Sequence, residues 1–156
     1  VALPTLCPNA VYEARVGAAL AAWAAEGGEA VAAGDLFLAD VRDWRARLVE
    51  RHGLRPLFPL WGEATAALAR AMLADGLRAT LVCVDPARVP PALCGAPFDA
   101  ALLAALPPAV DPCGERGEFH TFVTDGPGFA APVPCGLGAV VARDGFLYRE
   151  LVPPPA

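Results

Sequence analysis

Short apolar runs alternate with helical repeats through roughly the first two thirds of the chain. The clearest run, residues 79–84 (ATLVCV), is apolar almost throughout, as is usual for a strand buried on both faces. Strands that alternate with helices favour an α/β fold with a parallel sheet. The repeats predict helices over residues 9–26, 41–52, 64–75 and 99–106, and the runs predict strands over 30–33, part of 54–61, and 79–84.

The last forty or so residues carry β patterns instead. Residues 119–124 alternate between apolar and polar types, and Asp144-Gly145 separates two further runs as the turn of a hairpin. We therefore predict a parallel sheet with flanking helices plus a small C-terminal β portion. Residues 1–110 form the α/β part, and residues 111–156 supply an acidic loop, a strand and the hairpin of the same compact unit.

Composition narrows the class of protein. The 156 residues suit one domain, and no apolar run approaches the roughly 20 residues that cross a bilayer. The net charge of −5 disfavours a nucleic-acid surface, which normally needs a basic stripe. All twelve basic residues are arginine, which excludes a lysine-dependent phosphate loop and a Schiff-base lysine within this chain. We expect no nucleic-acid or membrane partner.

The five cysteines indicate the cellular compartment of the protein rather than a catalytic or metal-binding role. They are odd in number and widely spaced, and no pair has the CxxC spacing of a structural zinc site. Reduced thiols fit better than a disulfide framework, and the chain begins with no secretory signal pattern. We expect a cytoplasmic protein without a metal site of its own, in which Cys113 is not a covalent nucleophile.

The polar chemistry is concentrated in residues 111–127 (DPCGERGEFHTFVTDGP). Gly114 and Gly117 allow tight turns and close approach to a ligand, and the strand that follows gives the loop a rigid base. Glu115 and Glu118 can steer a cationic acceptor, deprotonate an attacking amine or hold Mg²⁺. The alternative is a solvated acidic turn capped by Arg116.

Other candidates keep two interpretations each. His120 is either a proton shuttle or a packed structural residue, and the alternation places it opposite to Thr121. Thr121 is either a hydrogen-bond donor to substrate or a β-branched strand residue. Asp35 and Asp85 follow predicted strands, where ligands of parallel sheets bind, so they are expected to converge on the acidic loop. A turn or helix-cap role is the alternative for Asp35.

Several segments together resemble the diphthine–ammonia ligase-like family of N-type ATP pyrophosphatases. They are residues 34–42 (GDLFLADVR), 59–61 (PLW) and 114–127 (GERGEFHTFVTDGP). The resemblance extends over residues 4–151, and the GERGEFHT stretch is its most specific part. His120 stands where many members have a second acid, and GDLFL replaces a different loop. These departures look like a bacterial branch, which would need an acceptor other than diphthine.

The resemblance implies a HUP-like (adenine nucleotide alpha-hydrolase-like) fold and a ligase that uses ATP and Mg²⁺. Such enzymes adenylate a carboxylate, release pyrophosphate and let ammonia displace AMP. The family's SGGKDS-type phosphate loop is not in this sequence, so the chain is expected to carry the acceptor-side portion and to be inactive without that segment. The expected catalytic residues are Glu115, Glu118, His120 and Thr121, and the expected substrate-binding residues are Gly34, Asp35, Trp61, Gly114 and Gly117.

Two other functions stay open at this point. One is a non-catalytic module that binds a small ligand or a protein. The other is an ATP-independent hydrolase in which Glu115 and Glu118 form an acid–base pair. A segment like SGGKDS upstream of Val1 would favour the ligase, and turnover without ATP would favour the hydrolase.

Overall fold

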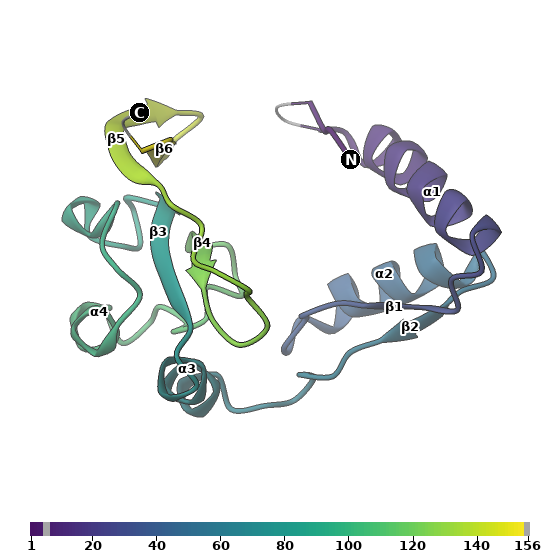
Figure 1. Cartoon of the computed structure of the whole chain (residues 1–156), viewed down its shortest axis with the longest axis horizontal. Coiled ribbons are helices and arrows are strands. Elements are labelled where there is room, and N and C mark those ends of the chain that lie inside the picture. The colour runs from purple at the N-terminus through teal and green to yellow at the C-terminus, as the bar shows by residue number, and fades with distance from the viewer. Residues whose placement is uncertain (5–6, 155–156) are drawn as a thin grey trace. The chain divides into compact units, whose positions relative to one another are not determined.

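The protein divides into two units, Val1–Gly62 and Glu63–Ala156. The structure, a computed structural model, describes residues 1–4 and 7–154 (Figure 1). The predicted segments 1–110 and 111–156 also contain Thr5, Leu6, Pro155 and Ala156, which lie outside the described residues. The predicted boundary at residue 110 falls inside the second unit, and the organisation of the whole chain as one compact unit stays a prediction.

The first unit has the order helix, strand, helix, strand. Its elements are α1 (Asn9–Ala25), β1 (Ala30–Ala32), α2 (Ala39–Glu50) and β2 (Arg55–Leu57). Alanine, the strongest helix former, dominates α1, and the chain leaves this helix through Gly27 in the left-handed conformation (φ +91°). β1 and β2 pair in parallel around α2, with Val31 opposite Pro56. The core of this unit consists of Leu20, Leu48, Val49 and Leu54.

The second unit is built on an antiparallel sheet. Its elements are α3 (Thr65–Ala74), β3 (Arg78–Val84), η1 (Pro91–Leu93), α4 (Ala100–Ala105), β4 (Phe119–Asp125), β5 (Gly136–Arg143) and β6 (Phe146–Val152). The strand order is β4-β3-β6-β5, with every neighbouring pair antiparallel. Figure 1 shows β4 beside β3. Leu81 and Val84 of β3 are fully buried in a core with Ala69 of α3 and Leu102 of α4. Thr80 and Val82 on the opposite face of β3 are only half-buried, so the predicted burial on both faces is correct in part.

The prediction of one parallel sheet is correct only for β1 and β2. β3 does not join them, because both of its edges are bonded within the second unit. One edge pairs with β4, and the other pairs with β6 and with residues 95–98 through the bonds of Leu81 and Ala79. An apolar run shows that both faces of a strand are buried, but not in which direction its neighbours run. The fold is thus mixed α/β, with a small parallel sheet and a larger antiparallel sheet.

The helix bounds agree with the predicted ones to within a few residues, and the hairpin forms at its predicted turn. Asp144 and Gly145 both have positive φ (52° and 84°), as two-residue hairpin turns require. No helix within residues 1–4 and 7–154 is long and apolar enough to cross a membrane.

Candidate functional site

The acidic loop, residues 111–118, is made of two consecutive turns. The amide of Gly114 donates to the carbonyl of Asp111, and the amide of Gly117 donates to the carbonyl of Gly114, both at 2.9 Å. Gly114 and Gly117 have φ values of +70° and +77°, a conformation that side chains disfavour. The glycine spacing in GERGE is therefore a backbone requirement of the double turn.

Asp111 holds the first turn from inside. Its side chain is buried, and its Oδ2 accepts hydrogen bonds from the amides of Cys113 (3.2 Å) and Glu115 (2.9 Å). A short aspartate side chain suits this role because it reaches amides two to four residues ahead. The structure therefore gives Asp111 a defined role in shaping the loop.

Glu118 holds the second turn and is completely buried, with 0% of its side chain exposed. Its Oε1 accepts from the amide of Asp111 (3.1 Å) and from Nη2 of Arg88 (3.0 Å), and its Oε2 accepts from the amide of Arg116 (2.9 Å). Nη1 of Arg88 also donates to the carbonyl of Arg116. A buried carboxylate is stable only with such partners, so Glu118 is not part of a solvated turn.

The loop amides are therefore used within the loop. Each backbone N–H from Asp111 to Gly117 donates to Asp111, Gly114 or Glu118, Pro112 having none to donate. Amides that already bond to internal carboxylates cannot also surround a phosphate. The loop is held in one shape and is not an anion cradle.

A depression of about 350 Å³ opens beside this loop and the start of β4. Its lining brings together five of the predicted site residues, Gly114, Glu115, Gly117, His120 and Thr121, with Cys113 and Phe119. Glu118 does not line it. Most of the predicted site residues of the acidic loop and β4 therefore border one cavity. The two glutamates occupy different positions, because Glu115 borders the depression whereas Glu118 lies beneath the loop.

His120 and Thr121 both line the depression, although the alternation placed them on opposite sides. The ladder between β3 and β4 is irregular at this point, since Leu81 pairs with Thr121 while Cys83 pairs with His120. An extra residue in one strand bends the ladder and redirects nearby side chains. The extra residue, Val82, lies in β3, and the irregularity adjoins the two β4 residues that line the cavity.

A smaller recess of about 100 Å³ adjoins the depression, with which it shares Cys113, Phe119 and Thr121. The rest of its lining is apolar and consists of Met72, Leu77, Phe98 and Val123. The site thus combines a polar mouth with a short apolar extension.

Asp85 lies beside the acidic loop, as predicted. Its amide donates to the carbonyl of Glu118 at 2.8 Å, and its Oδ1 accepts from the amide of Ala87. The side chain therefore shapes the turn after β3. This turn also places Arg88 against Glu118.

The remaining predicted residues, Gly34, Asp35 and Trp61, belong to the first unit, where they follow β1 and β2. The amide of Gly62 donates to the carbonyl of Leu36 at 2.8 Å, so these segments lie together at one end of the parallel strands. Asp35 is buried and pairs with Nε of Arg45 at 2.8 Å. Trp61 stacks under the guanidinium of Arg42, 4.1 Å from its ring centre. Convergence of Asp35 on the acidic loop stays a prediction.

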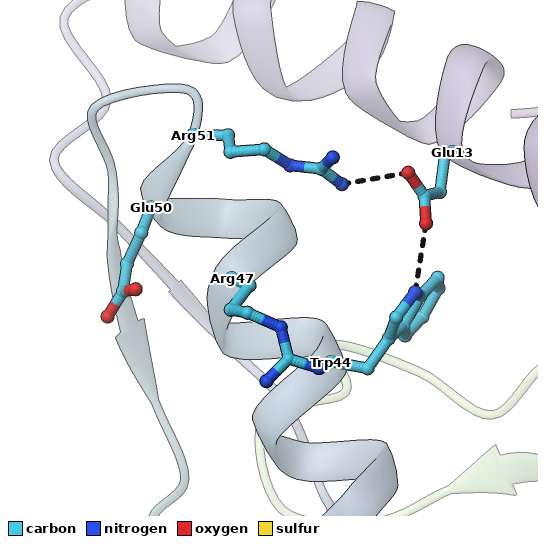
Figure 2. Close-up of a pocket in the computed structure, with 5 residues that line it drawn as sticks. All are labelled: Glu13, Trp44, Arg47, Glu50 and Arg51. Carbon is cyan, nitrogen blue, oxygen red and sulfur yellow. Dashed lines mark hydrogen bonds and ion pairs between the residues drawn. The ribbon is translucent and has the colours of Figure 1, made fainter.

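The first unit has a larger open depression of about 480 Å³, lined by Glu13, Trp44, Arg47, Glu50 and Arg51 (Figure 2). Glu13 accepts hydrogen bonds from Nη2 of Arg51 (2.8 Å) and Nε1 of Trp44 (2.9 Å). These two bonds, that of Arg51 first, lower the pKa of Glu13. Its charge is thus engaged in joining α1 to α2. None of the predicted site residues lines this depression.

Arg88 is the principal residue that sequence reasoning missed. It lies 30 positions before Glu118 in a proline-rich segment, and no spacing pattern connects the two. Asp111 was visible only as one of several acids near the loop. A signal for its role existed in the turn-forming order Asp-Pro-Cys-Gly.

The thiol of Cys113 is protonated at neutral pH. Burial raises its pKa to about 11, and the charges of Asp111 and Glu115 act in the same direction. The pKa of Cys113 in the folded protein exceeds its unfolded value of about 8.5. The contribution of this thiol to the stability of the folded protein is therefore fully present below pH 8.5 and is lost as the pH rises toward 11. A protonated thiol is a weaker nucleophile than a thiolate.

Iodoacetamide should therefore alkylate Cys113 slowly at pH 8, with a rate that rises until the pH nears 11. The site of alkylation is measured by peptide mass spectrometry across a pH series. The matched control is the chain unfolded in denaturant, in which the rate should reach half its maximum near the ordinary thiol pKa of about 8.5. A native half-maximum near pH 8 would contradict this assignment.

Gly114 and Gly117 should respond differently to alanine. Both substitutions incur the left-handed penalty of about 1 kcal/mol. A Cβ at Gly114 would also lie 2.8 Å from the carbonyl oxygen of Phe119, whereas nothing lies within 4 Å of a Cβ at Gly117. We expect Gly114→Ala to lower the free energy of unfolding by about 2 kcal/mol more than Gly117→Ala. Urea denaturation measures both, and equal losses would refute the packing argument.

The carboxylates of the loop do not provide a metal site by themselves. Within the described residues there is no group of three or more His, Cys, Asp or Glu side chains that could hold a metal ion. Glu118, the most enclosed oxygen donor of the loop, is already paired with Arg88. Mg²⁺ usually binds through one or two carboxylates together with substrate phosphates, a set that this loop does not supply alone.

Two comparisons with known proteins identify no family, so a functional assignment rests on the sequence and the geometry of the site. No protein-family model matches this chain, and a search of curated proteins finds no significant similarity.

Proposed function

We propose that this chain carries the acceptor-side portion of an ATP-dependent ligase that joins ammonia to a carboxylate, of the diphthine–ammonia ligase type. One observation carries the proposal. The residues of the GERGEFHT stretch on which the resemblance is strongest, Glu115, His120 and Thr121 with Gly114 and Gly117, line one cavity.

The chemistry requires a proton acceptor next to the acyl carbon. When ammonia forms the new C–N bond and AMP leaves with the electrons of the C–O bond, the nitrogen must lose a proton. Glu115 and His120 are the two groups of the depression that can accept it. Thr121 can donate a hydrogen bond that orients the acyl oxygen. Glu118 acts beneath them by fixing the loop.

The polar mouth and apolar recess support a small acceptor. A carboxylate would lie among the polar residues of the depression, and a short aliphatic part would enter the recess beside Met72 and Phe98. Glu115 also favours an incoming ammonium ion over an anion at the mouth. These features fit an ammonia-dependent reaction better than direct recognition of a polyphosphate.

The nucleotide belongs elsewhere in this proposal. The chain contains no lysine and no SGGKDS-type segment, and the amides of the acidic loop are already bonded internally. The residues present therefore do not fit the phosphates of ATP or a Mg²⁺ ion, and we assign no step of the reaction to them here.

The first unit supports a more specific proposal about the fold. We propose that β1, α2 and β2 are part of a HUP-like parallel sheet, the fold that the resemblance implies. Support comes from their parallel pairing and from the position of Asp35 and Trp61 beyond the carboxyl ends of the two strands. Ligands of such sheets bind at that edge.

The hydrolase alternative has less support. It needs Glu115 and Glu118 to act on one substrate as an acid–base pair, but Glu118 is completely buried and engaged with Arg88 and two amides. The binding-module alternative uses the same depression without chemistry, and the following experiment separates it from the ligase.

The test supplies the complete gene product with ATP, ammonium chloride and a panel of small carboxylic acids. The proposal predicts release of AMP and pyrophosphate that depends on both ammonia and one of the acids. Binding of an acid without nucleotide cleavage would favour the binding module instead. Turnover of a substrate without ATP would favour the hydrolase.

A further inference from the structure

β5 is an edge strand with exposed apolar side chains. Its inner side pairs with β6, and its outer side has no strand partner in the part of the chain that the structure describes. Leu137, Val140 and Val141 are 53%, 43% and 42% exposed, and residues 136–142 contain no charge and no proline. Soluble proteins usually protect such edges with charged residues or proline, so an open apolar edge indicates a pairing surface.

The hairpin geometry shows which backbone groups face outward. Because Asp144 and Gly145 form a two-residue turn, Arg143 and Phe146 exchange hydrogen bonds as the closing pair. Bonded and non-bonded pairs then alternate along the ladder. The N–H and C=O groups of Val140 and Ala142 therefore point away from β6, toward the open edge.

These outward groups are self-complementary. We propose that β5 pairs antiparallel with β5 of a second copy of this chain, on a two-fold axis at Val141. In this register Val140 of each copy faces Ala142 of the other, and each such pair can exchange two hydrogen bonds. Centring the axis on Val140 would bring Ala142 opposite Gly138, whose carbonyl is taken by Arg149. Centring it on Ala142 would bring Val140 opposite the turn.

The same register joins opposite charges. Ala139 of one copy lies opposite Arg143 of the second copy, and Oε2 of Glu150 bonds to the amide of Ala139 at 3.3 Å. Arg143 stacks over Tyr148, which lies on the same face of β6 as Glu150. Each Arg143 can therefore reach Glu150 of the other copy. The surface matches itself in hydrogen bonds, apolar contact and charge, which favours a second copy over an unrelated strand.

Sedimentation velocity over a wide range of concentration tests the pairing. The chain should show a reversible dimer of twice its mass. Val140→Pro removes an outward N–H without touching the β5–β6 ladder, so it should weaken dimerisation about tenfold or more. Val140→Thr keeps that N–H and should dimerise like the parent. A monomer at every concentration, or a Val140→Pro dimer as tight as the parent, would overturn the proposal.

Charge reversal tests the register independently of proline. Arg143→Glu and Glu150→Arg should each weaken the dimer, because like charges then meet across the two-fold axis. The double variant should restore the parent dissociation constant, since each pair is again of opposite sign. Circular dichroism confirms that each variant is folded. Failure of the double variant to recover any affinity would exclude this register.

Discussion

Glu118→Gln is expected to lower the free energy of unfolding by about 3 kcal/mol. The amide keeps the shape of the carboxylate but loses its charge, so Arg88 loses its ion-pair partner. The side-chain NH₂ of the glutamine must also face a hydrogen-bond donor. That donor is the backbone amide of Arg116 if the NH₂ replaces Oε2, or the backbone amide of Asp111 and Arg88 if it replaces Oε1. The loss is less than for a fully buried pair, because the side chain of Arg88 is 36% exposed.

Urea denaturation measures this loss of stability, and substitution of Arg88 gives a second test of the same ion pair. Arg88→Gln should also destabilise the protein, and the double variant should lose less than the sum of the two, because they share one interaction. Glu63→Gln, at an exposed position of the same unit, is the control and should change stability little. Additive losses would show that the ion pair does not stabilise the loop.

Glu115→Gln is expected to have the opposite profile, with turnover lowered about a hundredfold and a smaller loss of stability than Glu118→Gln. Glu115 borders the depression, and its backbone amide, which bonds to Asp111, is unaffected by the substitution. Removing a positioned proton acceptor slows the chemical step without breaking the loop. AMP release by the complete gene product measures turnover, and the melting temperature of the variant checks its fold.

Glu63→Gln again serves as the matched control, since it removes the same charge outside the depression. It should retain parent turnover. If Glu115→Gln and the control turn over equally fast, Glu115 takes no part in the reaction. His120 would then be the remaining proton acceptor of the depression.

The local structure was largely predictable because glycine and proline mark the ends of its elements. Gly27, Gly53 and Gly76 follow helices, and Asp144-Gly145 forms the predicted turn. The direction of β3 was not predictable. Periodicity reports burial, whereas the pairing of β3 with β4 and β6 depends on distant segments, such as Tyr148, which lies 65 positions after its partner Cys83.

The candidate site was predictable as a stretch but not as an arrangement. The glycines and polar residues of GERGEFHT identified the lining of the depression. The sequence did not distinguish Glu115 from Glu118, because the difference depends on Arg88, which is distant along the chain. Nor did it predict that His120 and Thr121 share a cavity, because alternation along a strand places neighbouring residues on opposite faces.

Amide hydrogen exchange of the acidic loop tests the central claim most directly, which is that Asp111 and Glu118 fix the loop from within. The amides of Cys113, Glu115 and Arg116 should exchange slowly although they lie in a loop. In Glu118→Gln the amide of Arg116 should exchange faster than that of Glu115, whose acceptor is Asp111. Exchange of all three amides at the rate of an unstructured peptide in the parent protein would contradict the account.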